Sequence, residues 1–198
     1  MPDLIAIDVA ILPPADVTQR AIALSASLPQ QPDQALRLDS EHLPHITLMQ
    51  LFVRANELET AFGRIRDIVQ GRPPLLLRVP GSGKSDHTVW MEIERTGDLV
   101  ELHERLMQDL RGIERENGSQ ASFVEGDARI NDVMWVAGYR LKSSLAQFTP
   151  HITLGHAAEP PPVEPFAFEA TRIAVCHLGR FCACRRVLRE WTLNRPHR

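Results

Sequence analysis

The pentapeptide Pro-His-Ile-Thr-Leu occurs twice in the chain, at Pro44–Leu48 and again at Pro150–Leu154. In an extended strand, side chains two positions apart point to the same side, so each copy presents an imidazole and a hydroxyl on one face and two aliphatic anchors on the other. The polar pairs are His45 with Thr47 in the first copy and His151 with Thr153 in the second. If the two halves of the chain face each other, both pairs meet in one cleft.

Two imidazoles and two hydroxyls in one cleft suit acid–base chemistry on a phosphate ester. An imidazole has an unperturbed pKa near ~6.5, so one ring can accept a proton near neutral pH while another donates one. Hydroxyls aimed at phosphoryl oxygens stabilise the charge that develops there. A single His-x-Thr is usually structural, whereas two identical five-residue copies favour a catalytic role that needs no metal and no other cofactor.

The composition is that of an ordinary soluble protein and excludes several classes of function. Of the 198 residues, 43% are hydrophobic and 24% are charged. No run approaches the roughly 20 apolar residues of a membrane span. The formal charge of −3 argues against a protein that wraps long duplex nucleic acid. The acidic residue in the opening Met-Pro-Asp-Leu is atypical of a signal peptide, so we expect a cytoplasmic protein.

Three further sequence features give weaker indications of function. Cys176, Cys182 and Cys184 lack a second Cys pair, so we expect free thiols in the core or sheet and no zinc site. The segment 81–85 (Gly-Ser-Gly-Lys-Ser) resembles part of a P-loop, but Arg78 stands where a glycine is required, so a hairpin loop is favoured. The C-terminal arginines either line an anion site or cover edge strands; they are Arg172, Arg180, Arg185, Arg186, Arg189, Arg195 and Arg198.

Hydrophobic periodicity predicts an α+β protein without regular βαβ units. Asp16 and Asn56 are plausible N-caps of the first two helices. The predicted strands are 4–12, 45–53, 75–79, 88–93, one from His151, 166–178 and 181–193; the helices are 16–28, about 57–70 and 98–113. We expect strands 75–79 and 88–93 to pair, and 166–178 to form a hairpin with 181–193. Residues 114–132 are predicted to be a loop, and Val133–Leu141 a short strand around Trp135 or part of a loop over the cleft.

At this point the chain resembles a known family, the 2H phosphoesterases, and within it the bacterial 2′-5′ RNA ligase-like proteins. The resemblance is carried by His45-Ile46-Thr47-Leu48, by His151-Ile152-Thr153-Leu154 and by the order of elements around them. Thr88–Met91 also resembles the strand that these relatives place between the motifs. The resemblance implies one domain over 1–198, with two pseudo-symmetric lobes, two antiparallel sheets around a central cleft and outer helices.

The resemblance also implies a function and the residues that perform it. It implies a metal-independent phosphodiesterase for 2′,3′-cyclic phosphate ends of RNA or small nucleotide cyclic phosphates, with no cofactor. His45 and His151 would be the acid–base pair, with His45 as the acid, and Thr47 and Thr153 would bind the phosphoryl oxygens. The alternatives are a 2′-5′ RNA ligase and a nucleotide-binding module without turnover. We expect a monomer whose partner is a nucleotide or an RNA end.

Substrate recognition is where the chain departs from the commoner family pattern. Many ligase-like relatives carry an arginine two residues after the second motif, where this chain has His156. We therefore expect His156 or a C-terminal arginine to supply a phosphate contact. Trp90 and Trp135 are candidates for stacking a base, although core packing is favoured for both indoles. His42 is not expected to join His45 as a metal ligand, because the intervening proline excludes a helix there.

Overall fold

The computed structural model describes residues 3–29 and 36–194. The predicted arginines at 195 and 198 lie outside these ranges. None of the helices in the described ranges has the length and apolar content needed to cross a membrane.

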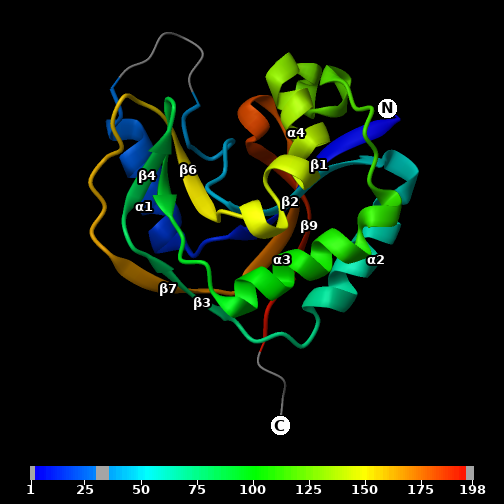
Figure 1. Cartoon of the computed structure of the whole chain (residues 1–198), viewed down its shortest axis with the longest axis horizontal. Coiled ribbons are helices and arrows are strands. Elements are labelled where there is room, and N and C mark those ends of the chain that lie inside the picture. The colour runs from blue at the N-terminus through cyan, green and yellow to red at the C-terminus, as the bar shows by residue number, and fades with distance from the viewer. Residues whose placement is uncertain (1–2, 30–35, 195–198) are drawn as a thin grey trace.

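Within the described ranges, the chain forms three antiparallel sheets and four α-helices (Figure 1). The strands are β1 (Leu4–Leu12), β2 (Ile46–Arg54), β3 (Leu75–Val79), β4 (Ser82–Ser85), β5 (Thr88–Glu92), β6 (His151–His156), β7 (Phe166–Ala170), β8 (Arg172–Leu178) and β9 (Cys184–Thr192). The helices are α1 (Ala15–Ser27), α2 (Leu58–Val69), α3 (Gly97–Asp109) and α4 (Ile130–Lys142). The sheets run in the orders β2-β1-β8-β9, β3-β7 and β4-β5-β6. The predicted α+β class is confirmed.

Both faces of β1 are covered, which explains why its sequence is almost continuously apolar. Ile7, Val9 and Ile11 belong to the main core together with residues of α2 and α3. Ala6 and Ala10 point to the opposite face, where a second apolar cluster includes residues of α4 and of the preceding loop. Asp8 lies between these two alanines on the second face and is the only charged residue of the strand core.

A β-bulge interrupts each of the two strands that carry the repeated pentapeptide. In the β1–β2 pair, Val9 lies opposite Met49 and Ala10 opposite Thr47, so Leu48 has no partner. In the β5–β6 pair the extra residue is Leu154, the leucine at the equivalent place of the second copy. Bulges recur near active sites because they redirect side chains. The two copies therefore share a local backbone irregularity as well as a sequence.

The pairing of the middle strands differs from the sequence prediction. The strand 75–79 pairs with β7, and the strand 88–93 pairs with β4 and β6. Segment 82–85, predicted as a loop, is β4 itself, because the turn lies at residues 86–87 instead. The predicted strand 166–178 is divided at Thr171 between two sheets, and only β8 forms the expected hairpin with β9.

The segment Val133–Leu141 is helical, so its prediction as a strand or loop was wrong. Val133, Val136 and Tyr139 are buried at helical spacing, and Asp132 forms a capping box with Arg129 at the start of α4. The expected caps of the first two helices were also wrong: Asp16 lies within the first turn of α1, and a 3-10 turn at Ala55–Glu57 precedes α2. Prolines 160–162 exclude a helix between β6 and β7, as predicted.

Candidate active site

The bulges extend each polar face by one residue beyond the pentapeptide. Because Leu48 is an extra residue in the ladder, Thr47 and Gln50 lie opposite Ala10 and Asp8 on the same face of the sheet. The second copy repeats this pattern, with Thr153 opposite Trp90 and His156 opposite Thr88. Each copy therefore presents three side chains to one side, which are His45, Thr47 and Gln50 in the first and His151, Thr153 and His156 in the second.

The two histidines of the motifs are held in the same way. His45 Nδ1 lies 2.7 Å from the Leu43 carbonyl oxygen, and His151 Nδ1 lies 2.7 Å from that of Thr149. A carbonyl can only accept a hydrogen bond, so each Nδ1 carries the proton. In the neutral ring Nε2 then keeps its lone pair. Both imidazoles consequently present Nε2 as the atom that takes up or releases a proton.

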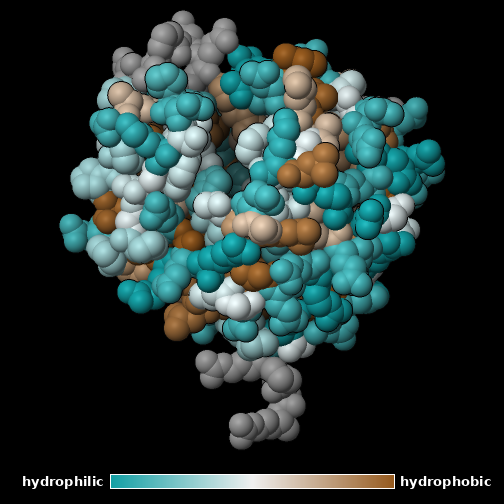
Figure 2. Space-filling model, viewed as in Figure 1, coloured by the Kyte–Doolittle hydropathy of each residue, from teal (hydrophilic) through white to brown (hydrophobic). Residues whose placement is uncertain are grey.

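Strands β2 and β6, which carry the two motifs, contact each other. Burial lowers the pKa of His151, and the charge of His45 lowers it further, so the two imidazoles interact electrostatically. Burial also lowers the pKa of His45. Figure 2 shows the surface hollowed between β6 and α4, in the part of the molecule where these strands meet. A neutral ring is thus favoured for both histidines.

A carboxyl group that the sequence analysis did not single out lies beneath the first motif. Asp8 Oδ2 is 2.6 Å from Thr47 Oγ1, 2.8 Å from Gln50 Nε2 and 3.7 Å from His45 Nε2. Its side chain is fully buried, and burial raises the pKa of the carboxyl from 3.8 to about 7, against the lowering effect of the two hydrogen bonds. The available signal was a lone acid within the apolar run 4–12.

The second motif has different surroundings. The Trp90 indole packs against His151, with the ring centroids 5.1 Å apart. Thr153 is partly exposed, and no hydrogen bond of its hydroxyl is recorded among residues 3–29 and 36–194. The first copy therefore has an acidic partner and the second an aromatic one. This asymmetry distinguishes the two histidines chemically despite their identical pentapeptides.

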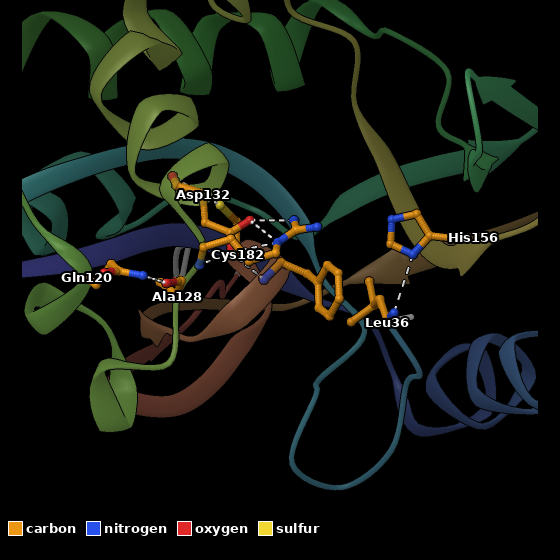
Figure 3. A network of polar contacts seen from close by, with 8 residues as sticks. Leu36, Gln120, Ala128, Asp132, His156 and Cys182 are labelled. Atoms are coloured by element: carbon orange, nitrogen blue, oxygen red, sulfur yellow. Dashed lines mark hydrogen bonds and ion pairs between the residues drawn. The ribbon is translucent and has the colours of Figure 1, made fainter. Parts of the chain in front are cut away.

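His156 lies at the edge of the same face, within a corner rich in cations and aromatic rings (Figure 3). Its Nδ1 accepts a hydrogen bond from the Leu36 amide at 3.3 Å, and its ring lies 5.3 Å from that of Phe181. The Arg129 guanidinium covers Phe181 at 4.0 Å from the ring centroid. Phe181 has a φ of 63°, a strained conformation that its amide stabilises by donating to Asp132 Oδ2.

One group of described residues has the atoms to coordinate a metal ion. The ligand atoms of Asp8, His45 and Cys184 lie within 4.8 Å of one another. Asp8 Oδ2 already takes part in two hydrogen bonds, with Thr47 and Gln50, and burial raises the pKa of the Cys184 thiol well above its usual value. A cation would have to break those bonds and remove the thiol proton, and the trio offers no fourth protein ligand. We therefore assign no metal to it.

The remaining candidates have the following surroundings. Trp135 is on α4 with 47% of its surface exposed. Lys84 pairs with Glu159 rather than facing an anion loop. Three C-terminal arginines form ion pairs with acids, namely Arg172 with Glu190, Arg185 with Glu41 and Arg189 with Glu59. The cysteines are free thiols, as expected, two buried and one partly buried.

The bulge at Leu48 also explains why a histidine, His103, is buried nearby. His103 Nδ1 donates to the Leu48 carbonyl oxygen at 2.6 Å, and His103 Nε2 accepts from the Leu145 amide at 2.8 Å. The ring stacks on Phe148 at 4.0 Å. Tyr139 also donates to the Leu48 oxygen. The carbonyl freed by the bulge thus ties β2 to α3 and α4.

We expect the His103 imidazole to make stability dependent on pH. Burial lowers its pKa below 6.5, so the unfolded chain binds the proton more tightly and stability falls as pH drops below ~6.5. The advantage of wild type over His103→Gln, measured by urea unfolding, should shrink by up to about 1.4 kcal/mol per pH unit. Asp8, with its raised pKa, has the opposite effect on the pH dependence of stability, but it is present in both proteins and its contribution cancels. A constant difference between pH about 7.5 and about 5.5 would contradict the assignment.

Comparison with known proteins identifies a family model and solved structures that resemble this chain. The family model of the 2′-5′ RNA ligase superfamily matches residues 13–180. Among solved structures, TT0787 of Thermus thermophilus is 18% identical with a TM-score of 0.65, and the match covers 98% of this chain and 100% of that one. Escherichia coli LigT complexed with NADP+ is 18% identical with a TM-score of 0.61, covering 96% of this chain and 98% of that one.

LigT complexed with 3′-AMP is also 18% identical, with a TM-score of 0.60 and coverage of 96% and 99%. No curated protein matches the chain. These identities establish a shared fold and nothing finer, whereas the family model covers most of the chain. The resemblance to the 2H phosphoesterases is thereby confirmed, and the chain belongs to the 2′-5′ RNA ligase superfamily.

Proposed function

We propose that the protein is a metal-independent phosphodiesterase that opens 2′,3′-cyclic phosphates, at RNA ends or in small nucleotides. One observation carries this proposal: His45 and His151 are fixed through Nδ1 to backbone carbonyls, present Nε2, and lie close enough for the charge of one to lower the pKa of the other. Two Nε2 atoms presented from contacting strands match a reaction that takes a proton on one side of a phosphorus atom and delivers one on the other.

In the proposed reaction, His151 accepts a proton from water as the water oxygen attacks phosphorus. His45, as an imidazolium, donates the Nε2 proton to the departing ribose oxygen, and Thr47 and Thr153 donate hydrogen bonds to the phosphoryl oxygens. Burial lowers the pKa of His151, which favours the neutral base. A bound phosphate anion favours the charged form of His45. The ligase direction uses the same groups with a ribose hydroxyl in place of water.

The test is turnover of three substrates in the presence of a chelator. These are a 2′,3′-cyclic mononucleotide, a short RNA with a cyclic phosphate end and a 2′-5′ dinucleotide. We expect hydrolysis of the cyclic esters to a monoester, and none by the His45→Ala/His151→Ala double variant prepared in parallel. Loss of activity with chelator, or equal rates in both proteins, would contradict the proposal. Joining of the cyclic end to a second RNA would favour the ligase instead.

We also propose that His156 binds a phosphate group of the substrate. It shares a face with His151 and Thr153, and its position is the counterpart of Gln50 in the first copy. His156→Ala is expected to raise KM about tenfold with kcat almost unchanged, because a contact made equally in ground and transition states affects binding alone. His156→Arg should retain a low KM, since a guanidinium also donates to phosphate. Unchanged KM and kcat in His156→Ala would rule the contact out.

A further inference from the structure

The Thr47 hydroxyl has one proton, and two groups compete for it. The proposed function requires Thr47 to donate to a phosphoryl oxygen. In the structure its Oγ1 lies 2.6 Å from Asp8 Oδ2, a separation typical of a hydroxyl bonded to a carboxyl group. If Asp8 is ionised, it has no proton to give and must accept the one from Thr47. The threonine then faces the substrate with lone pairs alone, which repel a phosphate oxygen.

The conflict disappears when Asp8 carries a proton. A protonated carboxyl group can donate through Oδ2 to Thr47 Oγ1 across the same 2.6 Å contact, and the threonine proton is then free to turn towards the cleft. Gln50 Nε2 can continue to donate to Oδ2, which retains a lone pair. The heavy atoms need not move. The direction of one hydrogen bond decides whether Thr47 is a donor or an acceptor towards the substrate.

We propose, as an extension of the proposed function, that Asp8 is a positioning residue: as a carboxylic acid it donates to Thr47 and directs the threonine O–H at the substrate phosphoryl group, and as a carboxylate it withdraws that donor.

The surroundings of Asp8 favour the acid form near neutrality. The side chain is fully buried, its Oδ1 has no hydrogen-bond partner among residues 3–29 and 36–194, and burial raises the pKa of the carboxyl to about 7. The titratable groups that face it from the neighbouring elements are His45, Tyr139, Cys176, Cys182 and Cys184. Burial raises the pKa of Tyr139, Cys182 and Cys184, so these three add no charge near neutrality. Protonation of His45 works in the other direction, because an imidazolium 3.7 Å away favours the carboxylate.

The Asp8→Asn substitution holds residue 8 permanently in the proposed state, in which it donates a hydrogen bond to Thr47. An amide nitrogen in place of Oδ2 has two protons, one for Thr47 Oγ1 and one for Gln50. The Gln50 amide can flip to accept it, because its Oε1 is buried without a partner in the described structure. The variant therefore keeps every hydrogen bond of the pair but cannot ionise. A thermal melt monitored by circular dichroism verifies its folding.

The readout is the affinity for 3′-AMP, measured by calorimetry at pH about 6 and about 8. Wild type and Asp8→Asn should bind alike at the lower pH. At the higher pH the variant should bind about tenfold tighter, the loss expected when one hydrogen bond to a charged group is removed. Titration of the ligand phosphate is common to both proteins and cancels. Parallel weakening of both proteins with pH would overturn the proposal.

A double-mutant cycle separates action through Thr47 from simple repulsion by the Asp8 charge. In a Thr47→Val background, Asp8→Asn should change the affinity at the higher pH by less than about twofold. In a Thr153→Val background, the matched control from the second motif, the tenfold effect should persist. If the effect persisted in Thr47→Val as well, Asp8 would act by charge alone and the proposed route through threonine would be wrong.

A measurement on the unliganded protein keeps this proposal distinguishable from the proposed function. Carboxyl-carbon NMR of protein labelled at aspartate, with the Asp8 signal assigned by its absence in Asp8→Asn, should show Asp8 titrating near pH 7. Thr47→Val should move that titration to higher pH, because the hydroxyl stabilises the carboxylate. A carboxylate still ionised at pH about 5 would overturn the role of Asp8. Failure of wild type to bind 3′-AMP or turn over cyclic esters, with this titration intact, would instead count against the proposed function.

Discussion

Replacing His45 with alanine is expected to abolish hydrolysis of a nucleoside 2′,3′-cyclic phosphate but to spare a diester that releases 4-nitrophenolate. A ribose alkoxide leaves poorly unless it is protonated, whereas 4-nitrophenolate is stable without a proton. Loss of a general acid should therefore cost about 10²- to 10⁴-fold in kcat on the cyclic ester and much less on the activated one. His151→Ala removes the base that activates water, so it should cost about the same factor on both esters.

Steady-state kinetics with the two esters measure these losses. His42→Ala is the matched control, since this imidazole lies near His45 in sequence but is bonded to Asp39 on the surface. It should change neither rate. If the activated ester rescued His151→Ala and not His45→Ala, the two roles would be exchanged. Equal losses on both esters in both variants would contradict the division into an acid and a base.

Phe52→Ala is expected to cause the largest loss of stability. Phe52 lies on β2 and is fully buried in the second apolar cluster, where its ring meets Phe123 edge to face at 5.9 Å. A β-carbon added at Gly118 would collide with the Phe52 ring, so the segment 114–129 before α4 is packed closely onto this side chain. Removing the ring should lower the free energy of unfolding by about 3–5 kcal/mol, through lost burial and a residual cavity.

Thermal unfolding should show this loss as a melting temperature about 10 °C lower, from the usual scaling for chains of this size. Leu76→Ala is the control, because 70% of the Leu76 side chain is exposed and its truncation should shift the midpoint very little. A Phe52→Ala midpoint within a degree or two of wild type would mean that the loop repacks to fill the space.

The parts of the molecule that the sequence predicted well are those governed by local periodicity. Alternation within the pentapeptides placed His45 with Thr47 and His151 with Thr153 on common faces, and i, i+3 and i+4 spacing located α2 and α3. Such spacing reflects the local secondary structure, so it can be recognised from neighbouring residues alone. The hairpin of β8 with β9 was predicted, but the predicted pairing of strands 75–79 and 88–93 was wrong, because β3 pairs with β7, which lies far away in the chain, and no local signal specifies that pairing.

The missed features depend on tertiary structure. Periodicity cannot reveal a bulge, since the extra Leu48 is recognised only from the register against β1. If the bulge is overlooked, Gln50 is assigned to the wrong face of the sheet and its hydrogen bond with Asp8 is missed. The helix α4 was misread because its apolar residues are not confined to one stripe: Val133 and Val136 are buried, while Met134 and Trp135 are exposed to solvent. Asp8 itself was visible in the sequence, as an acid within an apolar strand, and such a residue should be inspected wherever it occurs.

The bulge at Leu48 has a consequence for the length of the motif. Deleting this one residue would restore an unbroken ladder and still leave Thr47 and Gln50 pointing the same way, two places apart. What would disappear is the carbonyl that His103 and Tyr139 bind. The one extra residue between Thr47 and Gln50 therefore fastens β2 to the two helices that pack against it.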